Sequence, residues 1–128
     1  MTRTGALVLA AGALCACAPR EAPEAEAASL ALDCAAGYEA LQSQIVGRPG
    51  LRPAPIERNE PYRIYSEADG SASYILTEPG APAHPAVLKQ TAVRRAGVLA
   101  MENEGCAFGD AGAYADLKAY WDSVAQAR

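Results

Sequence analysis

A stripe of apolar residues between positions 34 and 45 has the spacing of an amphipathic helix. Its members, four, three and four positions apart, are Cys34, Tyr38, Leu41 and Ile45. That spacing places them on one side of a helix. Asp33 is a favourable N-cap, and Gly47–Gly50 is a strong stop signal. The pattern predicts a helix that begins at Asp33 and ends near Gly47.

A second stripe of the same kind stands at the C-terminal end. Its members, three, four and three positions apart, are Tyr114, Leu117, Trp121 and Val124. Asp110 precedes them as an N-cap, and charged residues such as Lys118 and Asp122 fall mostly on other faces. We therefore expect a second helix that turns its aromatic side toward the core.

Between the two helices the pattern changes to short strand-like runs separated by turn residues. The stretch from Leu51 to Pro61 holds three prolines and is expected to be an irregular crossing. Asp69-Gly70 is a hairpin signal, because glycine tolerates a positive φ. Four strands are predicted over residues 61–67, 73–77, 86–93 and 98–101, the last of them running out near residue 105.

The order helix, four strands, helix favours the α+β fold class. We expect a small antiparallel sheet of about four strands, with the N-terminal and the C-terminal helix packed together on one face. Residues 33–128 then form a single globular domain of ordinary size. Alanine is the commonest apolar residue and buries little area, so the core depends on a few large side chains.

Residues 1–16 have the layout of a secretory signal peptide. Arg3 gives a positive start, and residues 6–16 then form an uncharged run of eleven positions. No apolar run reaches the roughly 18 residues that a membrane-spanning helix needs. The sequence predicts export with removal of this leader.

The end of the leader, Leu14-Cys15-Ala16-Cys17, resembles the lipobox of bacterial lipoproteins. In that class the final cysteine is acylated and becomes the mature N-terminus, so the resemblance implies that Cys17 is a membrane anchor. The departure from the pattern is Cys15, where Ala, Ser, Thr or Gly is more usual. The resemblance implies a cell-envelope protein facing the periplasm. Ala18 looks like the outer-membrane sorting pattern of enteric lipoproteins.

An ordinary signal-peptidase site is the alternative. A cut within Ala16-Cys17-Ala18 would release the protein without an anchor. Pro19 would then follow the cut directly, at a position where signal peptidases disfavour proline. The lipoprotein interpretation is favoured for that reason.

Residues 17–32 are predicted to be a flexible tether that follows the lipidated cysteine. They are rich in Ala, Glu and Pro, and no large apolar side chain appears before Leu30. Such a segment buries too little surface to fold by itself. Fully extended, it would let the domain stand about 50 Å from the membrane.

The cysteines predict a disulfide in the domain. Of the four, Cys15 leaves with the leader and Cys17 is consumed by acylation, so Cys34 and Cys106 remain. Neither has a neighbouring histidine or lysine to activate a thiolate, and two cysteines are too few for structural zinc. In an oxidising compartment we expect them to join the first turn of the first helix to the loop before the last helix.

Charge and motifs narrow the range of partners. The net charge is -4 and the isoelectric point is about 4.9, whereas a nucleic-acid-binding protein normally has a basic face. The sequence shows no metal-binding cluster, no glycine-rich phosphate loop and no nucleophile motif. We therefore predict no nucleic acid, no metal and no cofactor.

His84 is the one histidine and the first candidate for chemistry. Pro85 biases its backbone toward an extended conformation, which would hold the imidazole in place. A histidine held in this way can bind an anion or act as a base. A catalytic histidine also needs partners that the sequence does not show. The simpler interpretation is that Pro and Gly make a long connection and that His84 fills a notch on the surface.

Aromatic residues around the hairpin are further candidates for ligand binding. Tyr62, Tyr65 and Tyr74 could form a platform for a saccharide or a partner, although cross-strand packing is the commoner role for tyrosines in strands.

The charged candidates are weaker. Glu102 and Glu104 share one strand face but lack the spacing of a calcium loop, so a solvated strand end is expected. Arg94-Arg95 could meet lipid phosphates, but two charges at a turn usually serve solubility.

Taken together, these features predict a lipid-anchored envelope protein with a non-catalytic binding or structural accessory domain. Its partners would be the membrane, through the anchor, and an unidentified envelope protein or cell-wall component. The segment from Thr77 to Val87 loosely resembles uncharacterised bacterial envelope proteins, and that resemblance implies no activity. The alternative is a small envelope hydrolase or ligand-binding enzyme that acts through His84 and a nearby carboxylate.

Overall fold

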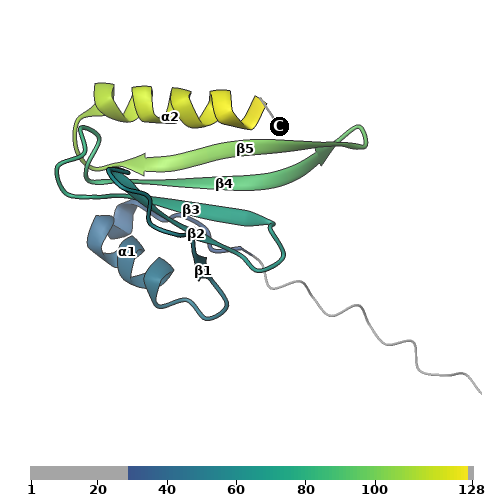
Figure 1. Cartoon of the computed structure of the whole chain (residues 1–128), viewed down its shortest axis with the longest axis horizontal. Helices are drawn as coiled ribbons and strands as arrows, with labels where there is room; N and C mark the ends of the chain where they lie inside the picture. The colour runs from purple at the N-terminus through teal and green to yellow at the C-terminus, as the bar shows by residue number, and fades with distance from the viewer. Residues whose placement is uncertain (1–28, 127–128) are drawn as a thin grey trace, which may run out of the picture.

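The structure, a computed structural model, describes residues 29–126 and has a five-stranded sheet at its centre. In chain order its elements are the 3-10 turn η1 (Cys34–Ala36), α1 (Tyr38–Val46), β1 (Arg52–Pro53), β2 (Tyr62–Ser66), β3 (Ala72–Thr77), β4 (Ala86–Arg95), β5 (Val98–Ala107) and α2 (Ala111–Gln126). Each strand pairs antiparallel with the next, which makes a simple meander (Figure 1). The predicted α+β class is confirmed.

The sheet has one strand more than predicted, and its last two strands are longer. The extra strand, β1, lies inside the proline-rich crossing and is too short to leave an alternating pattern. β4 and β5 extend to a tight turn at Ala96-Gly97, where both residues have positive φ. Because such a turn matches the twist of the strands, pairing continues up to Arg95 opposite Val98.

The two helices lie on opposite faces of the sheet, so the expectation that they share one face is wrong (Figure 1). On one face, α1 buries Leu41 and Ile45 against a cluster that includes Leu76. On the other face, α2 buries Trp121 against Ile75. Neighbouring residues of a strand point to opposite sides. Strands that are apolar at consecutive positions, as β3 is here, therefore need cover on both faces.

The first helix begins later than the sequence indicates. Asp33 caps the 3-10 turn η1 through the N–H of Ala35, and Gly37 then adopts a φ of 87°. That glycine separates η1 from α1, so Cys34 lies outside the helix that carries Leu41 and Ile45.

The predicted disulfide between Cys34 and Cys106 is present, with the two Cα atoms 5.4 Å apart. Its position differs from the expectation: Cys106 belongs to β5 and pairs with Val87, rather than lying in the loop before α2. The bridge therefore fastens η1 to one end of an edge strand, on the α1 face.

The described chain begins at residue 29, so the leader, Cys15, Cys17 and most of the predicted tether lie outside the described residues. Of the predicted tether, Leu30 and Leu32 pack against the α1-face core. None of the helices described here is long and apolar enough to cross a membrane.

Candidate functional site

His84 lines a shallow cleft at the end of the sheet where β3 connects to β4. The cleft has a volume of about 620 Å³ and is lined by Ala36, Gly37, Tyr38, Glu39, Ala40, Gln42, Glu78, Pro79, His84 and Pro85. These residues come from η1, the first two turns of α1, and the β3–β4 loop. The disulfide partner Cys34 belongs to the same 3-10 turn as Ala36, so the bridge helps to hold one wall of the cleft.

The imidazole of His84 is held in one orientation by Thr77. Its Nδ1 lies 3.0 Å from the Thr77 carbonyl oxygen and 3.2 Å from the Thr77 Oγ1. A carbonyl oxygen can only accept, so Nδ1 carries the proton of the neutral ring. Within the described residues Nε2 has no hydrogen-bond partner, which leaves its lone pair available.

Thr77 is itself fixed by the start of β4. Its buried hydroxyl accepts from the N–H of Ala86 at 2.8 Å and donates to the Ala86 carbonyl at 3.0 Å. Because the hydroxyl proton is used on Ala86, Oγ1 can only accept from His84. The orientation of the imidazole is thus set by the strand pair.

Tyr38 completes the support of His84. Its hydroxyl donates to the Thr77 carbonyl at 2.7 Å, and its ring meets the imidazole edge-on with centroids 5.1 Å apart. Burial, and secondarily the carboxylate of Glu78, raise the pKa of Tyr38 above its ordinary value. The hydroxyl therefore stays protonated and keeps its role as a donor. Tyr38 belongs to the apolar stripe of the predicted helix, and its position in the sequence carries no signal of a contact with His84.

Acceptor groups dominate the rim of the cleft. Glu39 and Glu78 are its two acids, and His84 is the one lining residue that can carry positive charge. The charge of Glu78 is in part neutralised by Arg63, whose Nε lies 3.6 Å from the Glu78 carboxylate and which does not itself line the cleft. The cleft is therefore suited to groups that donate hydrogen bonds or carry positive charge.

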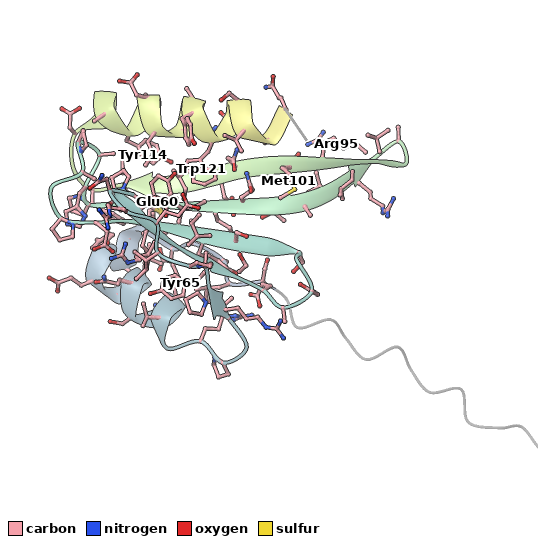
Figure 2. The ribbon with its side chains drawn as sticks, viewed as in Figure 1. Glu60, Tyr65, Arg95, Met101, Tyr114 and Trp121 are labelled. Atoms are coloured by element: carbon pink, nitrogen blue, oxygen red, sulfur yellow. A yellow bond between two sulfur atoms is a disulfide. The ribbon has the colours of Figure 1, made fainter. Side chains whose placement is uncertain are left out.

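The candidate tyrosines do not form one platform. Tyr65 and Tyr74 pair across β2 and β3 on the α1 face, whereas Tyr62 lies on the α2 face with its ring 5.3 Å from that of Trp121. In Figure 2, Tyr65 lies on the side of α1 and Trp121 on the side of α2. These rings serve mainly as packing groups on two different faces.

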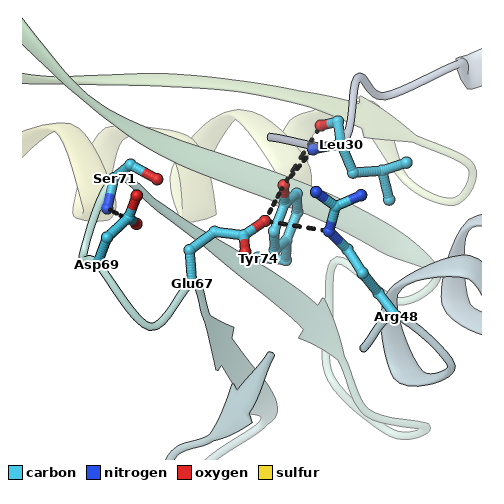
Figure 3. Close-up of polar contacts among 6 residues, drawn as sticks. All are labelled: Leu30, Arg48, Glu67, Asp69, Ser71 and Tyr74. Atoms are coloured by element: carbon cyan, nitrogen blue, oxygen red, sulfur yellow. Dashed lines mark hydrogen bonds and ion pairs between the residues drawn. The ribbon is translucent and has the colours of Figure 1, made fainter. Parts of the chain in front are cut away.

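Tyr74 links the start of the described chain to the sheet. Its buried hydroxyl accepts from the Leu30 N–H at 2.6 Å and lies 3.3 Å from Glu67, whose carboxylate pairs with Arg48 at 3.2 Å (Figure 3). Burial is the main cause that raises the pKa of Tyr74. The network holds residue 30 against the β2–β3 turn.

The acidic pair on β5 is engaged in ion pairs. Glu104 lies 3.6 Å from the nearly buried Lys89, and Glu102 pairs with Arg95. Nowhere in residues 29–126 do three or more His, Cys, Asp or Glu side chains gather to hold a metal ion. Both glutamates are solvent-exposed as expected, but they lie inside β5, opposite Thr91 and Lys89, and not at a strand end.

A polar network on the other side of β5 fastens α2 to the sheet. Asp122 accepts from Lys118 at 2.9 Å and from Asn103 at 2.8 Å. These two hydrogen bonds, the one from Lys118 first, lower the pKa of Asp122 below its ordinary value. The residues serve the helix–sheet contact.

Comparison with known proteins gives no further guide to the site: no family model, curated protein or solved structure matches the chain.

Proposed function

We propose that the protein is a lipid-anchored component of the cell envelope whose domain is a non-catalytic binding module. The anchor is Cys17, and the binding site is the cleft beside His84. The leader and the lipobox-like sequence support the location. The disulfide between Cys34 and Cys106 supports it as well, since such bonds persist in oxidising, extracytoplasmic compartments.

The observation that carries the binding proposal is the fixed imidazole of His84. Thr77 and Tyr38 hold it before any ligand arrives, so little ordering entropy is lost on binding. Its Nε2 and the carboxylates of Glu39 and Glu78 then act as acceptors in one cleft. The ligand class that fits is an amine, guanidinium or other donor-rich group on an envelope protein or a cell-wall component.

Crosslinking in intact envelopes tests the binding site. A partner crosslinked to the natural protein should be lost with His84→Ala and reduced with Glu39→Gln. Glu102→Gln is the matched control, because it removes the same charge at the far edge of the sheet. Equal partner recovery from all three variants, with unchanged melting temperatures, would rule out the cleft as the binding site.

The same geometry supports a second candidate, a small hydrolase. A histidine that lines the same cleft as two carboxylates and has an unpartnered Nε2 among the described residues can take a proton from a water molecule as a general base. Turnover of ester or amide substrates that disappears in His84→Ala would favour the enzyme. A partner bound without chemical change would favour the binding module.

The anchor has its own test. Cys17→Ser should move the exported protein from the detergent phase to the aqueous phase, or block its processing, because acyl chains hold a protein at the bilayer. Unchanged partition would contradict the lipid anchor. Separation of inner and outer membranes tests the sorting implied by Ala18.

A further inference from the structure

The β4–β5 hairpin extends beyond the rest of the sheet. β3 begins at Ala72, which pairs with Thr91, whereas the β4–β5 ladder continues to Arg95 opposite Val98. Four residue pairs of the ladder lie beyond Thr91. Ala92 still donates to the carbonyl oxygen of Ser71, so the last three pairs have no neighbouring chain beside them in the sheet, a projection of about 10 Å. Figure 1 shows this hairpin as the most extended part of the sheet.

The tip of the hairpin carries exposed aliphatic side chains between arginines. Val98 is 68% exposed and its neighbour Leu99 is 62% exposed. The register places Arg95 beside Val98 and Arg94 beside Leu99. Because side chains alternate along a strand, each face of the tip presents one aliphatic group and one guanidinium. Exposed apolar groups mixed with arginines are the composition of a surface that enters a lipid headgroup region.

The arginines add a local positive charge to an acidic protein, whose formal net charge is -4. Arg95 pairs with Glu102, an exposed contact that is easily exchanged for another anion. Arg94 contacts the carbonyl oxygen of Gly97 in the turn, and the structure pairs it with no carboxylate among the described residues. A guanidinium matches a phosphate group in shape and charge.

The described chain begins at the same end of the sheet as this tip. The N–H of Leu30 bonds to Tyr74, whose hydroxyl reaches Glu67 at the turn that leads into β3 (Figure 3). From there the chain runs to Cys34, which is bonded to Cys106 at the opposite end of β5. Leu30 thus lies toward the end of the sheet from which the hairpin projects.

We propose that the β4–β5 tip is a second membrane contact, in which Val98 and Leu99 enter the headgroup region of an anionic bilayer while Arg94 and Arg95 bind lipid phosphates. The inference rests on the proposed function in that an anchor at Cys17 would bring this end of the domain to the bilayer. Cys17 and Ser29 are twelve positions apart, a span of at most about 40 Å.

Hydrogen exchange on a vesicle-bound protein tests the contact directly. The chain beginning at Cys17 is coupled through that thiol to a maleimide lipid, since Cys34 and Cys106 are already bonded to each other. On vesicles that contain phosphatidylglycerol, amides 94–101 should exchange several-fold more slowly than on phosphatidylcholine vesicles. Equal exchange on the two kinds of vesicle would overturn the proposal.

Variants of the chain beginning at Ala18, which has no anchor, test the two chemical components of the tip in flotation with anionic vesicles. Arg94→Gln should weaken binding about fivefold, and added salt should weaken it further. Replacing Val98 and Leu99 by threonine, which is itself favourable in strands, removes the aliphatic groups and should weaken binding about tenfold.

Matched control variants lie in the segment between β1 and β2. Ile56 is as exposed as Val98, at 68%, and Arg58 is also exposed. Ile56→Thr and Arg58→Gln should leave vesicle binding unchanged. Losses equal to those of the tip variants, or no binding by the unaltered chain, would overturn the proposal.

The two proposals fail separately. The maleimide coupling replaces acylation, so the exchange result does not depend on whether cells acylate Cys17. If Cys17→Ser leaves the detergent-phase partition unchanged, only the anchor is contradicted. If amides 94–101 exchange equally on both kinds of vesicle, only the membrane contact is contradicted.

Discussion

The two faces of the sheet are stabilised in different ways. On the α2 face a sixteen-residue helix packs Tyr114, Leu117 and Trp121 against β-strand side chains, and the disulfide of the described residues does not involve this helix. Figure 2 shows Tyr114 and Trp121 between α2 and the sheet. On the α1 face the helix has nine residues, and the disulfide and the polar network of Tyr74 hold the segments that precede it.

The difference follows from helix length. A nine-residue helix is short of the length at which helices are stable alone, and it offers two fully buried anchors, Leu41 and Ile45. The disulfide and the Tyr74 network add order to the segments before α1, beside a buried cluster larger than that of the α2 face. The cleft beside His84 lies on this cross-linked face, where the bridge helps to hold its wall.

The largest effect is expected on the α2 face. Trp121 is 7% exposed, so Trp121→Ala should lower the free energy of unfolding by roughly 3–5 kcal/mol, measured by urea denaturation. Lys118→Ala on the same helix should cost no more than about 1 kcal/mol. Trp121→Phe should cost less than Trp121→Ala, because it keeps a ring and removes a buried indole N–H that has no partner in the described part of the chain. Similar small losses at both helix positions would show that packing does not hold this face.

The second largest loss of stability is expected when the disulfide on the α1 face is removed. Replacing Cys34 and Cys106 by alanine should lower the free energy of unfolding by about 2–4 kcal/mol, because the bridge closes a loop with a sequence separation of 72. Hydrogen exchange should rise most in η1 and α1 and least in α2. An equal loss of protection in both helices would contradict the claim that the bridge stabilises the α1 face in particular.

The polar network should contribute less. Tyr74→Phe removes the hydroxyl that accepts from the Leu30 N–H, so the expected loss is about 1 kcal/mol, with faster exchange at Leu30. Tyr65→Phe is the control, since Tyr65 pairs with Tyr74 and its hydroxyl makes no hydrogen bond to another described residue. Equal losses in the two variants would mean that the network does not hold the start of the chain.

The smallest effect concerns alkaline pH. Burial, followed by a hydrogen bond with Tyr120, raises the pKa of Tyr62 to about 12. An unfolded chain releases that proton near pH 10, so the folded protein binds more protons between these values and stability falls as pH rises through them. Tyr62→Phe should make this fall less steep in melting curves. An identical pH dependence in both proteins would contradict the burial of Tyr62 against α2.

The sequence predicts the α2 face better than the α1 face, because α2 is the longer helix. A long regular helix repeats its spacing, so Leu117 and Trp121 were identified as core residues from pattern alone. The start of α1 depends on Gly37 and a 3-10 turn, which leave no periodic signal. The placement of helices on opposite faces could be inferred only from consecutive apolar positions such as Ile75 and Leu76.

The candidate site was predicted only in part. His84 was identified by its rarity, and the disulfide by elimination among the cysteines. The contacts of Tyr38 and Thr77 with His84 join residues 38, 77 and 84, which meet only when α1 packs beside the β3–β4 loop. Long-range contacts of this kind have no short-range sequence signature.

The most direct test of the account is the intact mass of the mature protein purified from membranes without reductant. We expect a chain that begins at an acylated Cys17 and is two hydrogens lighter than its reduced form, because Cys34 and Cys106 are bonded. An unacylated chain that begins near Pro19, or one with two free thiols, would contradict it.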